Sequence, residues 1–582
     1  MELLVYTNIT DCLDEALYEL MRKERLSQEA SMEELCKIIL VKLYYERKNH
    51  SGLNFLEIGG NYGNNLDQLY DKLFLSYVPS YIYKGWEKID IRPQTFGEIV
   101  DLLSRIDFTN GFATELGKSF TSFLQRHYGW YVNDYSTPTV LTDYIFDVLD
   151  IKDFVSIYDP CSGIGGMLSA AYCKRGEHLK LSGNDISQTM VNITRLHLKM
   201  YGYEGDDFTC FDYTDKRNNQ ITIGYDCIVA QLPTRRQAFS MAGRAKSGYG
   251  EDFYDSDFAF IKGIIDQLNE DGMAAIVVPD SVIEDHKKKF IRDYLSSNVK
   301  LMNITKFEDV VTKGNYHKKS YYLLFIKKTT SQMSSQCSAT LLGVDSALNE
   351  KELAAQWVKR YIQGDRSITA NGHCKWFTFS DATNWNINLL FIRDKIGDKY
   401  EVVMLKDILS LKRDKERIDP EHEYQELRVR RRGMGVDVKR VYEGTHARDN
   451  LYVVKANDLV VSSFEADMGG MGYVPKELEG AVVTKNLYLF EVNKERVDSN
   501  YLMMVLNSEP VLEQLQAMNN RSHILSRISI SKFLTVVIPL PDLQTQKVLA
   551  KGLQRYIDKL NKAEDELTEA RKGFNKQVFG RE

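Results

Sequence analysis

The sequence lacks a long apolar run. No stretch of about 18 consecutive apolar residues occurs in its 582 residues, so we expect no membrane-spanning helix. The opening segment, MELLVYTNITDCLDEALYEL, carries acids where a secretory leader has a basic stretch followed by an apolar one. We therefore expect a cytoplasmic protein.

The sequence is also poor in metal-binding patterns. Its eight cysteines are scattered, with no CxxC pair and no histidine cluster at metal spacing, so we expect reduced core thiols and no metal site. A net charge of −6 excludes an overall polycation. Local basic runs at 235–236, 286–289 and 428–432 are candidates for phosphate contact, although solvated surface is the commoner interpretation of any one run.

The pattern of apolar residues changes along the chain. Apolar residues at helical spacing over 10–50 predict a helical N-terminal domain, placed at 1–110. From 111 to 330, β-branched runs alternate with helical segments, which predicts an α/β, Rossmann-like, doubly wound parallel sheet. We expect a polar connector at 331–400, a strand-rich α+β domain at 401–545 and an amphipathic helical tail at 546–582.

A glycine-rich turn follows the first strand expected in the central domain. The segment DPCSGIGG ends a β-branched run with Asp159 and places Gly163 and Gly165 before a helix, which lets the backbone approach a nucleotide-like ligand. The alternative is a tight strand-to-helix turn that binds nothing. The turn has no Gly-Lys-Ser/Thr, so a nucleoside without a polyphosphate, such as S-adenosylmethionine, fits it better than ATP.

Two more acids follow the next two strands. Asp185 ends the run LKLSGN, in the position where a carboxylate accepts ribose hydroxyls, and Asp212 follows the run FTCF. Asp185 could instead cap the helix that starts near Ser187. Because the carboxyl ends of parallel strands meet at one edge of a sheet, we expect Asp159, Asp185 and Asp212 to gather there.

The order of these segments resembles a known family. Thr137-Pro138, DPCSGIGGML, SGNDIS, YDCIVAQLPT, AAIVVPDSVI and KKSYYLLFIKK follow one another as in the modification subunit of type I restriction systems. Members of that family are N6-adenine DNA methyltransferases with a helical N-terminal domain. The resemblance implies that Asp159, Gly163 and Gly165 hold the methionine part of S-adenosylmethionine, and that Asp185 binds the ribose. It likewise puts Asp212 near the adenine ring and Thr137 and Pro138 beside the cofactor.

The catalytic tetrapeptide departs from the family. Where the family has Asn-Pro-Pro and an aromatic residue, this chain has Gln231, Leu232, Pro233 and Thr234. Gln231 keeps the amide group on a side chain that is one methylene longer than asparagine, but Thr234 cannot stack on a flipped base. Two hypotheses stay open. Either another aromatic, such as Phe239, Phe253 or Tyr254, supplies the stacking, or the domain is a catalytically impaired pseudo-methyltransferase that serves a defence complex by recognising DNA.

A neighbouring cysteine could be mistaken for a nucleophile. Cys161 follows a proline, as does the nucleophile of cytosine-C5 methyltransferases, but it lies in the glycine turn and we interpret it as a small loop residue.

Residues 401–575 resemble half of a type I specificity subunit, a target-recognition domain with a spacer helix. The most specific segment is IPLPDLQTQ, in which two prolines stop a strand before a helix begins. The resemblance implies binding of double-stranded DNA. The candidate contacts are Arg428, Arg430, Arg431, Arg432, Lys439, Arg440, Arg521, His523 and Arg527.

One recognition half reads a short half-site, so we expect a homodimer or a complex with separate restriction or defence subunits. No nuclease or helicase motif occurs in the sequence, so any cleavage needs another chain. The sequence thus predicts a site-specific DNA adenine-N6 methyltransferase of a restriction-modification or phage-defence system. A methyltransferase acting on RNA or protein is a weaker alternative.

Overall fold

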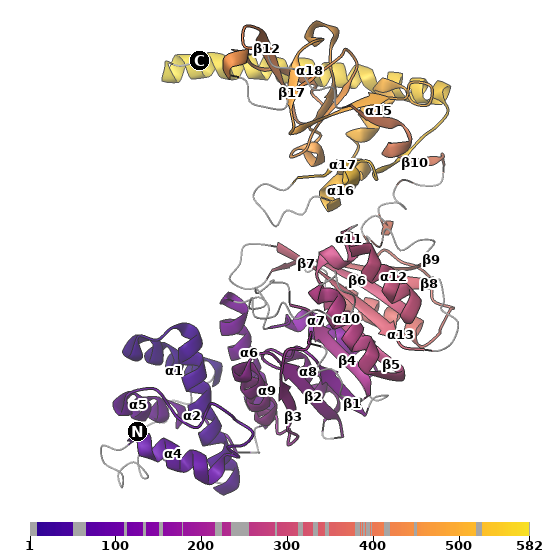
Figure 1. Ribbon diagram of the computed structural model, residues 1–582. Helices are drawn as coiled ribbons and strands as arrows, with labels where there is room; N and C mark the ends of the chain where they lie inside the picture. Colours follow the sequence, from indigo (N-terminus) through magenta and orange to yellow (C-terminus); the bar gives the residue numbers. More distant parts are fainter. Residues whose placement is uncertain are drawn as a thin grey trace. The chain divides into compact units, whose positions relative to one another are not determined.

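The computed structural model divides the chain into two units, Met1–Ile387 and Asn388–Glu582 (Figure 1). It describes residues 9–49, 66–109, 113–131, 136–150, 155–176, 178–215, 224–233, 255–285, 288–311, 318–329, 336–343, 348–378, 385, 387, 390–391, 396, 399–412, 419–446, 451–518 and 527–580. Within these ranges, no helix combines the length and the apolar character needed to span a bilayer.

The N-terminal segment is helical, as expected. Its helices are α1 (Ile9–Glu24), α2 (Gln28–Asn49), α4 (Leu66–Tyr77), α5 (Pro93–Leu103) and α6 (Ala113–Tyr131). In α1 the apolar residues Leu13, Leu17 and Leu20 recur every three or four positions and are fully buried. They share one apolar core with Leu35 and Ile38 of α2, which explains why the periodic pattern in the sequence predicted this element correctly.

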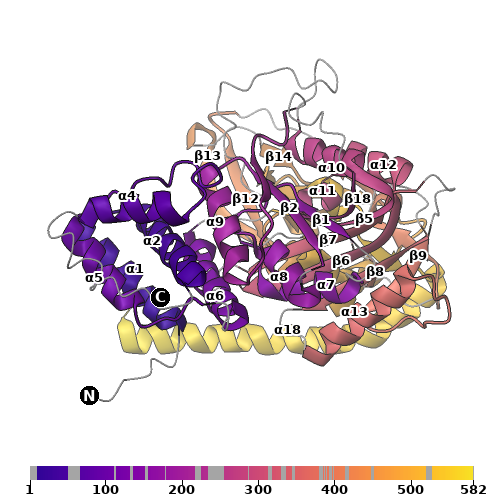
Figure 2. The ribbon, with the colours of Figure 1, turned by 90° about the horizontal axis from the view of Figure 1, so that it is seen from below.

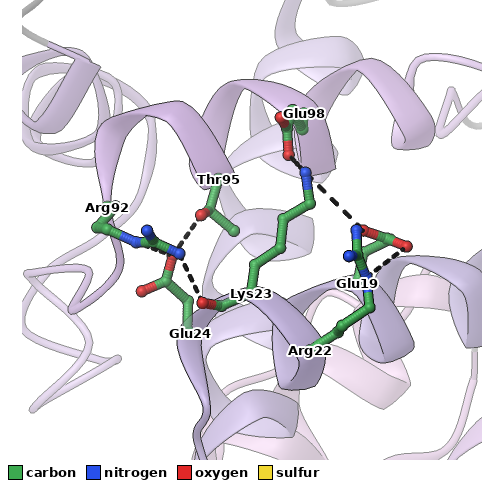
Figure 3. A network of polar contacts seen from close by, with 7 residues as sticks. All are labelled: Glu19, Arg22, Lys23, Glu24, Arg92, Thr95 and Glu98. Atoms are coloured by element: carbon green, nitrogen blue, oxygen red, sulfur yellow. Dashed lines mark hydrogen bonds and ion pairs between the residues drawn. The ribbon is translucent and has the colours of Figure 1, made fainter.

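Polar contacts orient α1 against α5 (Figure 3). Lys23 pairs with Glu98, and the carboxylate of Glu24 accepts hydrogen bonds from the Thr95 hydroxyl and, at 3.1 Å, from Arg92 Nε. Such pairs near the surface contribute only about 0–1 kcal/mol each to stability. They therefore add little to the packing of the apolar faces of α1 and α5, which share one core.

The helical segment packs directly on helix α9 (Gln188–Met200) of the central domain. Figure 2 shows α2, α6 and α9 side by side, and residues of all three helices belong to the same apolar core. Arg47 of α2 donates to the carbonyl of Lys199 at 2.5 Å, and Arg195 of α9 donates to the carbonyl of Ile82 at 2.8 Å. The helical segment therefore supports the element that follows the second strand.

The central domain is built on a nine-stranded sheet in the order β3-β2-β1-β4-β5-β7-β6-β8-β9. Its strands are β1 (Ser156–Asp159), β2 (Lys180–Asp185), β3 (Asp207–Cys210), β4 (Tyr225–Gln231), β5 (Leu268–Val278), β6 (Lys300–Val311), β7 (Lys318–Lys327), β8 (Gln336–Gly343) and β9 (Cys374–Thr378). Its other helices are α7 (Thr139–Val148), α8 (Gly166–Arg175), α10 (Ser256–Gln267), α11 (Asp280–Glu284), α12 (Lys289–Asn298) and α13 (Leu348–Ile362).

This sheet confirms the expected α/β, Rossmann-like class, but only part of it is parallel. Strands β3, β2, β1, β4 and β5 are mutually parallel, whereas β7 runs antiparallel to both β5 and β6. Only six residues separate the end of β6 from the start of β7, fewer than the dozen or more that a crossover between parallel strands needs.

The stretch expected as a connector, 331–400, contributes to the same sheet. Strand β8 pairs in parallel with β6, and β9 pairs with β8. Helix α13 packs beside α7, and its Val358 is fully buried in the core of the sheet. The sheet therefore extends past residue 330. Four consecutive residues of β8, Cys337 to Thr340, are buried and two of them are polar, so this segment has neither the alternation nor the apolar run that predicts a strand.

The described residues of the second unit form two four-stranded sheets and a two-stranded ladder, ordered β11-β18-β15-β16, β13-β12-β17-β14 and β10-β19. The strands are β10 (Val402–Met404), β11 (Leu409–Lys412), β12 (Glu423–Val429), β13 (Val436–Glu443), β14 (Leu451–Val453), β15 (Leu459–Ser462), β16 (Met471–Tyr473), β17 (Val482–Thr484), β18 (Leu487–Val492) and β19 (Val537–Pro539). The helices whose full bounds are described are α15 (Ser499–Leu506), α16 (Glu509–Met518), α17 (Ile530–Phe533) and α18 (Leu543–Phe579). This unit confirms the expected α+β domain with a terminal helix.

Helix α18 has 37 residues, about 55 Å at 1.5 Å per residue. It begins where the two prolines end β19, and Asp542 caps it by accepting hydrogen bonds from the next amides. Near its start, the buried Gln546 accepts from the amide of Asp498 at 2.8 Å. Farther along, Leu567 and Phe574 are 50% and 60% exposed, so this part of the helix has an uncovered apolar stripe within the unit.

Candidate functional site

The glycine turn between β1 and α8 has left-handed backbone at two positions. Gly163 has φ +53° and Gly165 has φ +78°. A Cβ at Gly165 would lie 3.0 Å from Cγ2 of Thr194 on α9, and the hydroxyl of Thr194 donates to the carbonyl of Gly163 at 2.8 Å. Both the backbone angle and the close approach therefore require glycine at residue 165.

Asp185 ties the turn to the end of β2. One of its carboxylate oxygens accepts from the amide of Gly163 at 3.0 Å, and the other accepts from the amide of Ser187 at 2.9 Å. Burial raises the pKa of Asp185, and these backbone hydrogen bonds oppose the rise. Ser187, not Asp185, is the N-cap of α9. The alternative role that the sequence left open for Asp185, the cap of α9, is therefore taken by Ser187.

Asp159 is almost fully buried at the end of β1. It accepts from the amide of Cys161 at 3.0 Å, and burial raises its pKa to about 7, with the nearby charge of Asp185 adding to the rise. The thiol of Cys161 donates to the carbonyl of Gln231 at 3.1 Å, and burial raises its pKa well above the usual range. A thiol that stays protonated is a poor nucleophile, in agreement with a loop role for Cys161.

Asp212 lies beyond β3 and closes a turn. Its carboxylate accepts from the amide of Thr214 at 2.9 Å and from the Thr214 hydroxyl at 2.7 Å. Asn184 connects this turn to the glycine turn, because its amide nitrogen donates to the carbonyls of both Pro160 and Phe211. Sequence reasoning missed Asn184, whose only signal was its place beside an acid at a strand end.

A second missed residue is Ile186. It follows Asp185 directly, and 60% of its surface is exposed although it is a large apolar side chain. An exposed apolar surface beside buried carboxylates suits the flat face of a nucleobase. The signal in the sequence was an isoleucine after the acid, where the chain leaves the sheet.

Gln231 ends β4 with its side chain buried. The amide oxygen has no hydrogen-bond partner among the described residues. The backbone here is held on both sides, because the Gln231 carbonyl accepts from Cys161 and the amide of Leu232 donates to the carbonyl of Val277 at 2.9 Å. Leu232 is buried and Pro233 is half-buried. Thr234 and the candidate aromatics Phe239, Phe253 and Tyr254 lie outside the described residues.

The sheet order brings these groups to one edge. Since β3, β2, β1 and β4 are adjacent and parallel, Asp212, Asp185, Asp159 and Gln231 follow neighbouring carboxyl ends. Thr137, which is buried, and Pro138 lie at the start of α7 instead. The described residues contain no cluster of side chains arranged to hold a metal ion.

The candidate DNA contacts of the second unit lie mainly on and after β12. Arg428 and Arg430 both pair with Asp437, at 2.7 and 2.8 Å, and Arg431 pairs with Glu465 at 2.9 Å. All three arginines are nevertheless exposed, so ion pairing inside the unit does not withdraw them from solvent.

The remaining candidates are placed differently. Arg432 has φ +57° in the turn after β12, and its amide donates to the carbonyl of Met468. Arg527 donates to Asn486 at 3.0 Å and lies over the ring of Phe464. Arg521 and His523 are outside the described residues.

Two family models match the chain. Residues 118–361 match the model described as N-6 DNA methylase, and residues 397–570 match the type I restriction modification DNA specificity domain. The chain joins an N-6 DNA methylase domain to a type I specificity domain. No curated protein matches the sequence. The methylase match ends at residue 361 and so includes β8 and most of α13, in agreement with the extent of the sheet.

Solved structures with similar folds include methyltransferase subunits. A type I restriction-modification methyltransferase subunit from Streptococcus thermophilus is 13% identical, with a TM-score of 0.48 over 66% of this chain and 96% of that one. A modification subunit of a putative type I restriction enzyme from Vibrio vulnificus YJ016 is 12% identical, with a TM-score of 0.46 over 65% and 95%. The type IIG restriction endonuclease BpuSI is 10% identical, with a TM-score of 0.46 over 94% and 74%.

Proposed function

We propose that this chain is a site-specific DNA methyltransferase that transfers a methyl group from S-adenosylmethionine to N6 of adenine. The specificity domain would read double-stranded DNA, in the cytoplasm, as part of a restriction-modification or phage-defence system. The observation that carries the proposal is the buried amide oxygen of Gln231, without a partner among the described residues, beside the glycine turn of a methylase domain.

The residues at the sheet edge fit the cofactor. S-adenosylmethionine supplies an activated methyl group when bound. Asp159 offers a carboxylate to its ammonium group, and each oxygen of Asp185 keeps a lone pair for a ribose hydroxyl besides the backbone hydrogen bond it accepts. Ile186 offers an apolar surface to the adenine ring. The roles of Asp212, Thr137 and Pro138 beside the cofactor stay proposals from the family resemblance.

Gln231 would act on the target base. A buried polar atom without a partner costs about 1–3 kcal/mol, so a hydrogen bond from an incoming amine offsets a cost already present in the free protein. An amide oxygen that accepts from the amine keeps the nitrogen lone pair available for the methyl group. The target adenine has to leave the base stack to reach this buried position.

The direct test is methylation of DNA by the full chain. Genomic DNA incubated with S-adenosylmethionine is digested, and N6-methyladenine is measured by mass spectrometry. Gln231→Leu should lower the rate at least a hundredfold with little change in cofactor binding. The control is Gln267→Leu, which removes another buried glutamine whose amide accepts from Tyr213 at 2.8 Å. If both variants lower the rate equally, Gln231 has no special role.

A second candidate is a catalytically impaired pseudo-methyltransferase that recognises DNA for a defence complex. The observation in its favour is the tetrapeptide itself, in which Thr234 stands where an aromatic residue would stack on the base. The double variant Gln231→Asn with Thr234→Phe should raise methylation if the pocket is open and only these two residues impair it. Cofactor and DNA binding with no methylation, before and after this change, would favour the impaired protein.

We also propose an assembly through α18, as a homodimer or with separate restriction or defence subunits. Leu567 and Phe574 are seven residues apart and exposed, which is the spacing of a coiled-coil stripe. Light scattering after size-exclusion chromatography should show a mass above one chain for the natural protein, and one chain for Leu567→Lys with Phe574→Lys. A single-chain mass for the natural protein, with and without DNA, would contradict the homodimer.

The domain borders are proposals as well. We place the helical N-terminal domain at 1–110 and the methylase domain at 111–378, with α6, which contacts both α1 and α9, as the helix that joins them. The recognition domain is placed at 401–545 and the helical tail at 546–582.

A further inference from the structure

The hairpin of β12 and β13 contains a bulge that places two cations side by side. Leu427 pairs with Val438, but Glu426 pairs with Arg440, so Lys439 is an extra residue on β13. In a regular strand, neighbouring side chains point to opposite faces. A bulge breaks this alternation and can redirect a side chain. Lys439 and Arg440 consequently point to the same face of the hairpin.

A buried carboxylate holds both cations on that face. Glu426 is 1% exposed, and its two oxygens accept from Lys439 Nζ at 2.8 Å and from Arg440 Nη2 at 2.6 Å. Arg440 is further fixed by the ring of Tyr442, whose centroid lies 4.9 Å from the guanidinium. The side chains of Lys439 and Arg440 remain 51% and 54% exposed. They are therefore held in place and still open to solvent.

Asp437 repeats this arrangement on the same hairpin by pairing with Arg428 and Arg430. Asp437 and Arg428 are opposite each other in the register, one pair away from Leu427 and Val438. These last two residues pack into the apolar core under the hairpin, so the charged groups belong to the outer face. Four cations over two carboxylates leave an excess of two positive charges there.

The arginine turn at the tip of the hairpin is less suited to enter a DNA groove by itself. The amides of Arg432 and Gly433 donate to the carbonyls of Met468 and Gly469, before β16. These two backbone hydrogen bonds tie the tip to a loop of the other four-stranded sheet. The outer face of the strands, and not the tip, is thus the surface available to a ligand as large as a duplex.

We propose that Arg428, Arg430, Lys439 and Arg440, here called the basic face, bind the phosphate backbone of double-stranded DNA, and that Glu426 is a positioning residue for Lys439 and Arg440. This inference rests on the proposed DNA-reading function. Phosphate is the fitting ligand because exposed guanidinium and ammonium groups form strong, charge-assisted hydrogen bonds to it. Cations held in place beforehand lose less side-chain entropy when the phosphates arrive.

The test is the salt dependence of DNA binding by the full chain. A fluorescent 30-base-pair duplex of mixed sequence is titrated from 50 to 200 mM salt. Lys439→Ala with Arg440→Ala should weaken binding at least tenfold and reduce the slope of log K against log salt by about 1.8, or about 0.9 for each lost phosphate contact. The matched control is Arg496→Ala, which removes an exposed arginine paired with Glu401 elsewhere in the unit and should change neither quantity.

Two results would overturn the basic face, and a third tests the proposed function instead. If the natural chain binds DNA and the double variant keeps its affinity and slope, the contact lies elsewhere. If a duplex RNA of equal length binds as tightly, and the same variants lose this RNA binding, the ligand is not specifically DNA. If the natural chain binds no DNA at all, the proposed DNA-reading function fails, together with the inference that rests on it.

Glu426→Gln tests positioning by the sign of its effect. The change makes the basic face more positive, so charge attraction alone predicts tighter DNA binding. Positioning predicts the opposite, a loss of about fivefold with a shallower salt slope, because Lys439 and Arg440 are no longer held together. Glu426→Asp should restore part of the affinity. Tighter binding by Glu426→Gln, with an unchanged melting temperature, would refute the positioning role.

Discussion

Asp159 should make cofactor binding depend on pH. Burial raises the pKa of this carboxyl to about 7 in the free protein. At pH 5.5 only about 3% of it is ionised, and at pH 7.0 about half is. A ligand that presents an ammonium group binds the ionised carboxylate better, so the affinity for S-adenosylmethionine should rise about fifteenfold between these two pH values. The affinity should stop rising below about pH 7.7, because near that pH the α-amino group of the ligand loses its own proton.

The same pKa has a consequence for stability with a definite sign. Since the folded-state pKa lies above the ordinary value of 3.8, the folded protein binds more protons than the unfolded chain between about pH 4 and 7. The contribution of Asp159 to stability is therefore present at low pH and lost as the pH rises through 7. At about 1.36 kcal/mol per pKa unit, the loss is about 4 kcal/mol.

Isothermal titration calorimetry can measure the binding effect. Titrations at pH 6 in two buffers of different ionisation enthalpy should show release of nearly one proton on binding of S-adenosylmethionine. Asp159→Asn should abolish both the proton release and the pH dependence. A ligand control is 5′-methylthioadenosine, which lacks the ammonium group and should bind equally well across the range. The reasoning is refuted if Asp159→Asn keeps the pH dependence, or if methylthioadenosine shows it too.

Two further predictions concern the glycine turn and the helical segment. Gly165→Ala should weaken S-adenosylmethionine binding about tenfold in a cofactor titration, because its Cβ meets Thr194. The control Gly176→Ala has the same φ of +78° but lies in open space, so it should lower stability in urea unfolding without changing the affinity for the cofactor. Glu46→Ala should destabilise the chain by about 3–5 kcal/mol in urea unfolding, because it leaves the buried Lys42 without its ion pair, whereas replacing both residues with apolar ones should recover most of the loss.

The central sheet was predictable because its signals are local. Strands β1 and β2 each end in an acid, and helices α8 and α9 begin seven and three residues after them. That pattern predicts Asp159 and Asp185 at strand ends, and parallel strands bring such ends to one edge of the sheet. The left-handed angle of Gly165 likewise follows from a glycine in a tight turn.

The support of the site was not predictable in the same way. Arg195 and His197 are buried on α9, and their partners lie far away in the sequence, at Ile82 and at Thr121. His197 also contacts the carbonyl of Ile164 in the glycine turn at 2.7 Å. Its ring therefore bridges Thr121 of α6 and the glycine turn. No periodicity in the sequence reveals a partner so distant, because hydrogen-bond pairing across domains depends on the tertiary fold alone.

Strand register hides another part of the site from the sequence. A run such as that from Arg428 to Arg432 looks like free positive charge, yet Asp437 and Glu465 neutralise part of it. Glu426 and Arg440 look unrelated in the sequence until the bulge brings them together. Which cations are held and which are free is a property of pairing between strands, and one shifted residue changes it.

The altered tetrapeptide can be judged from the backbone that carries it. Two hydrogen bonds hold the main chain at the end of β4, from Cys161 to the Gln231 carbonyl and from the Leu232 amide to Val277. The backbone therefore cannot shift to compensate for a glutamine side chain that is longer than asparagine. The extra methylene therefore moves the amide about 1.5 Å farther from β4 than an asparagine would reach. A pocket adapted to glutamine should then lose activity on Gln231→Asn, while a pocket that merely lost its asparagine should gain it. The direction of that single change separates an adapted enzyme from an impaired one more sharply than the absolute rate does.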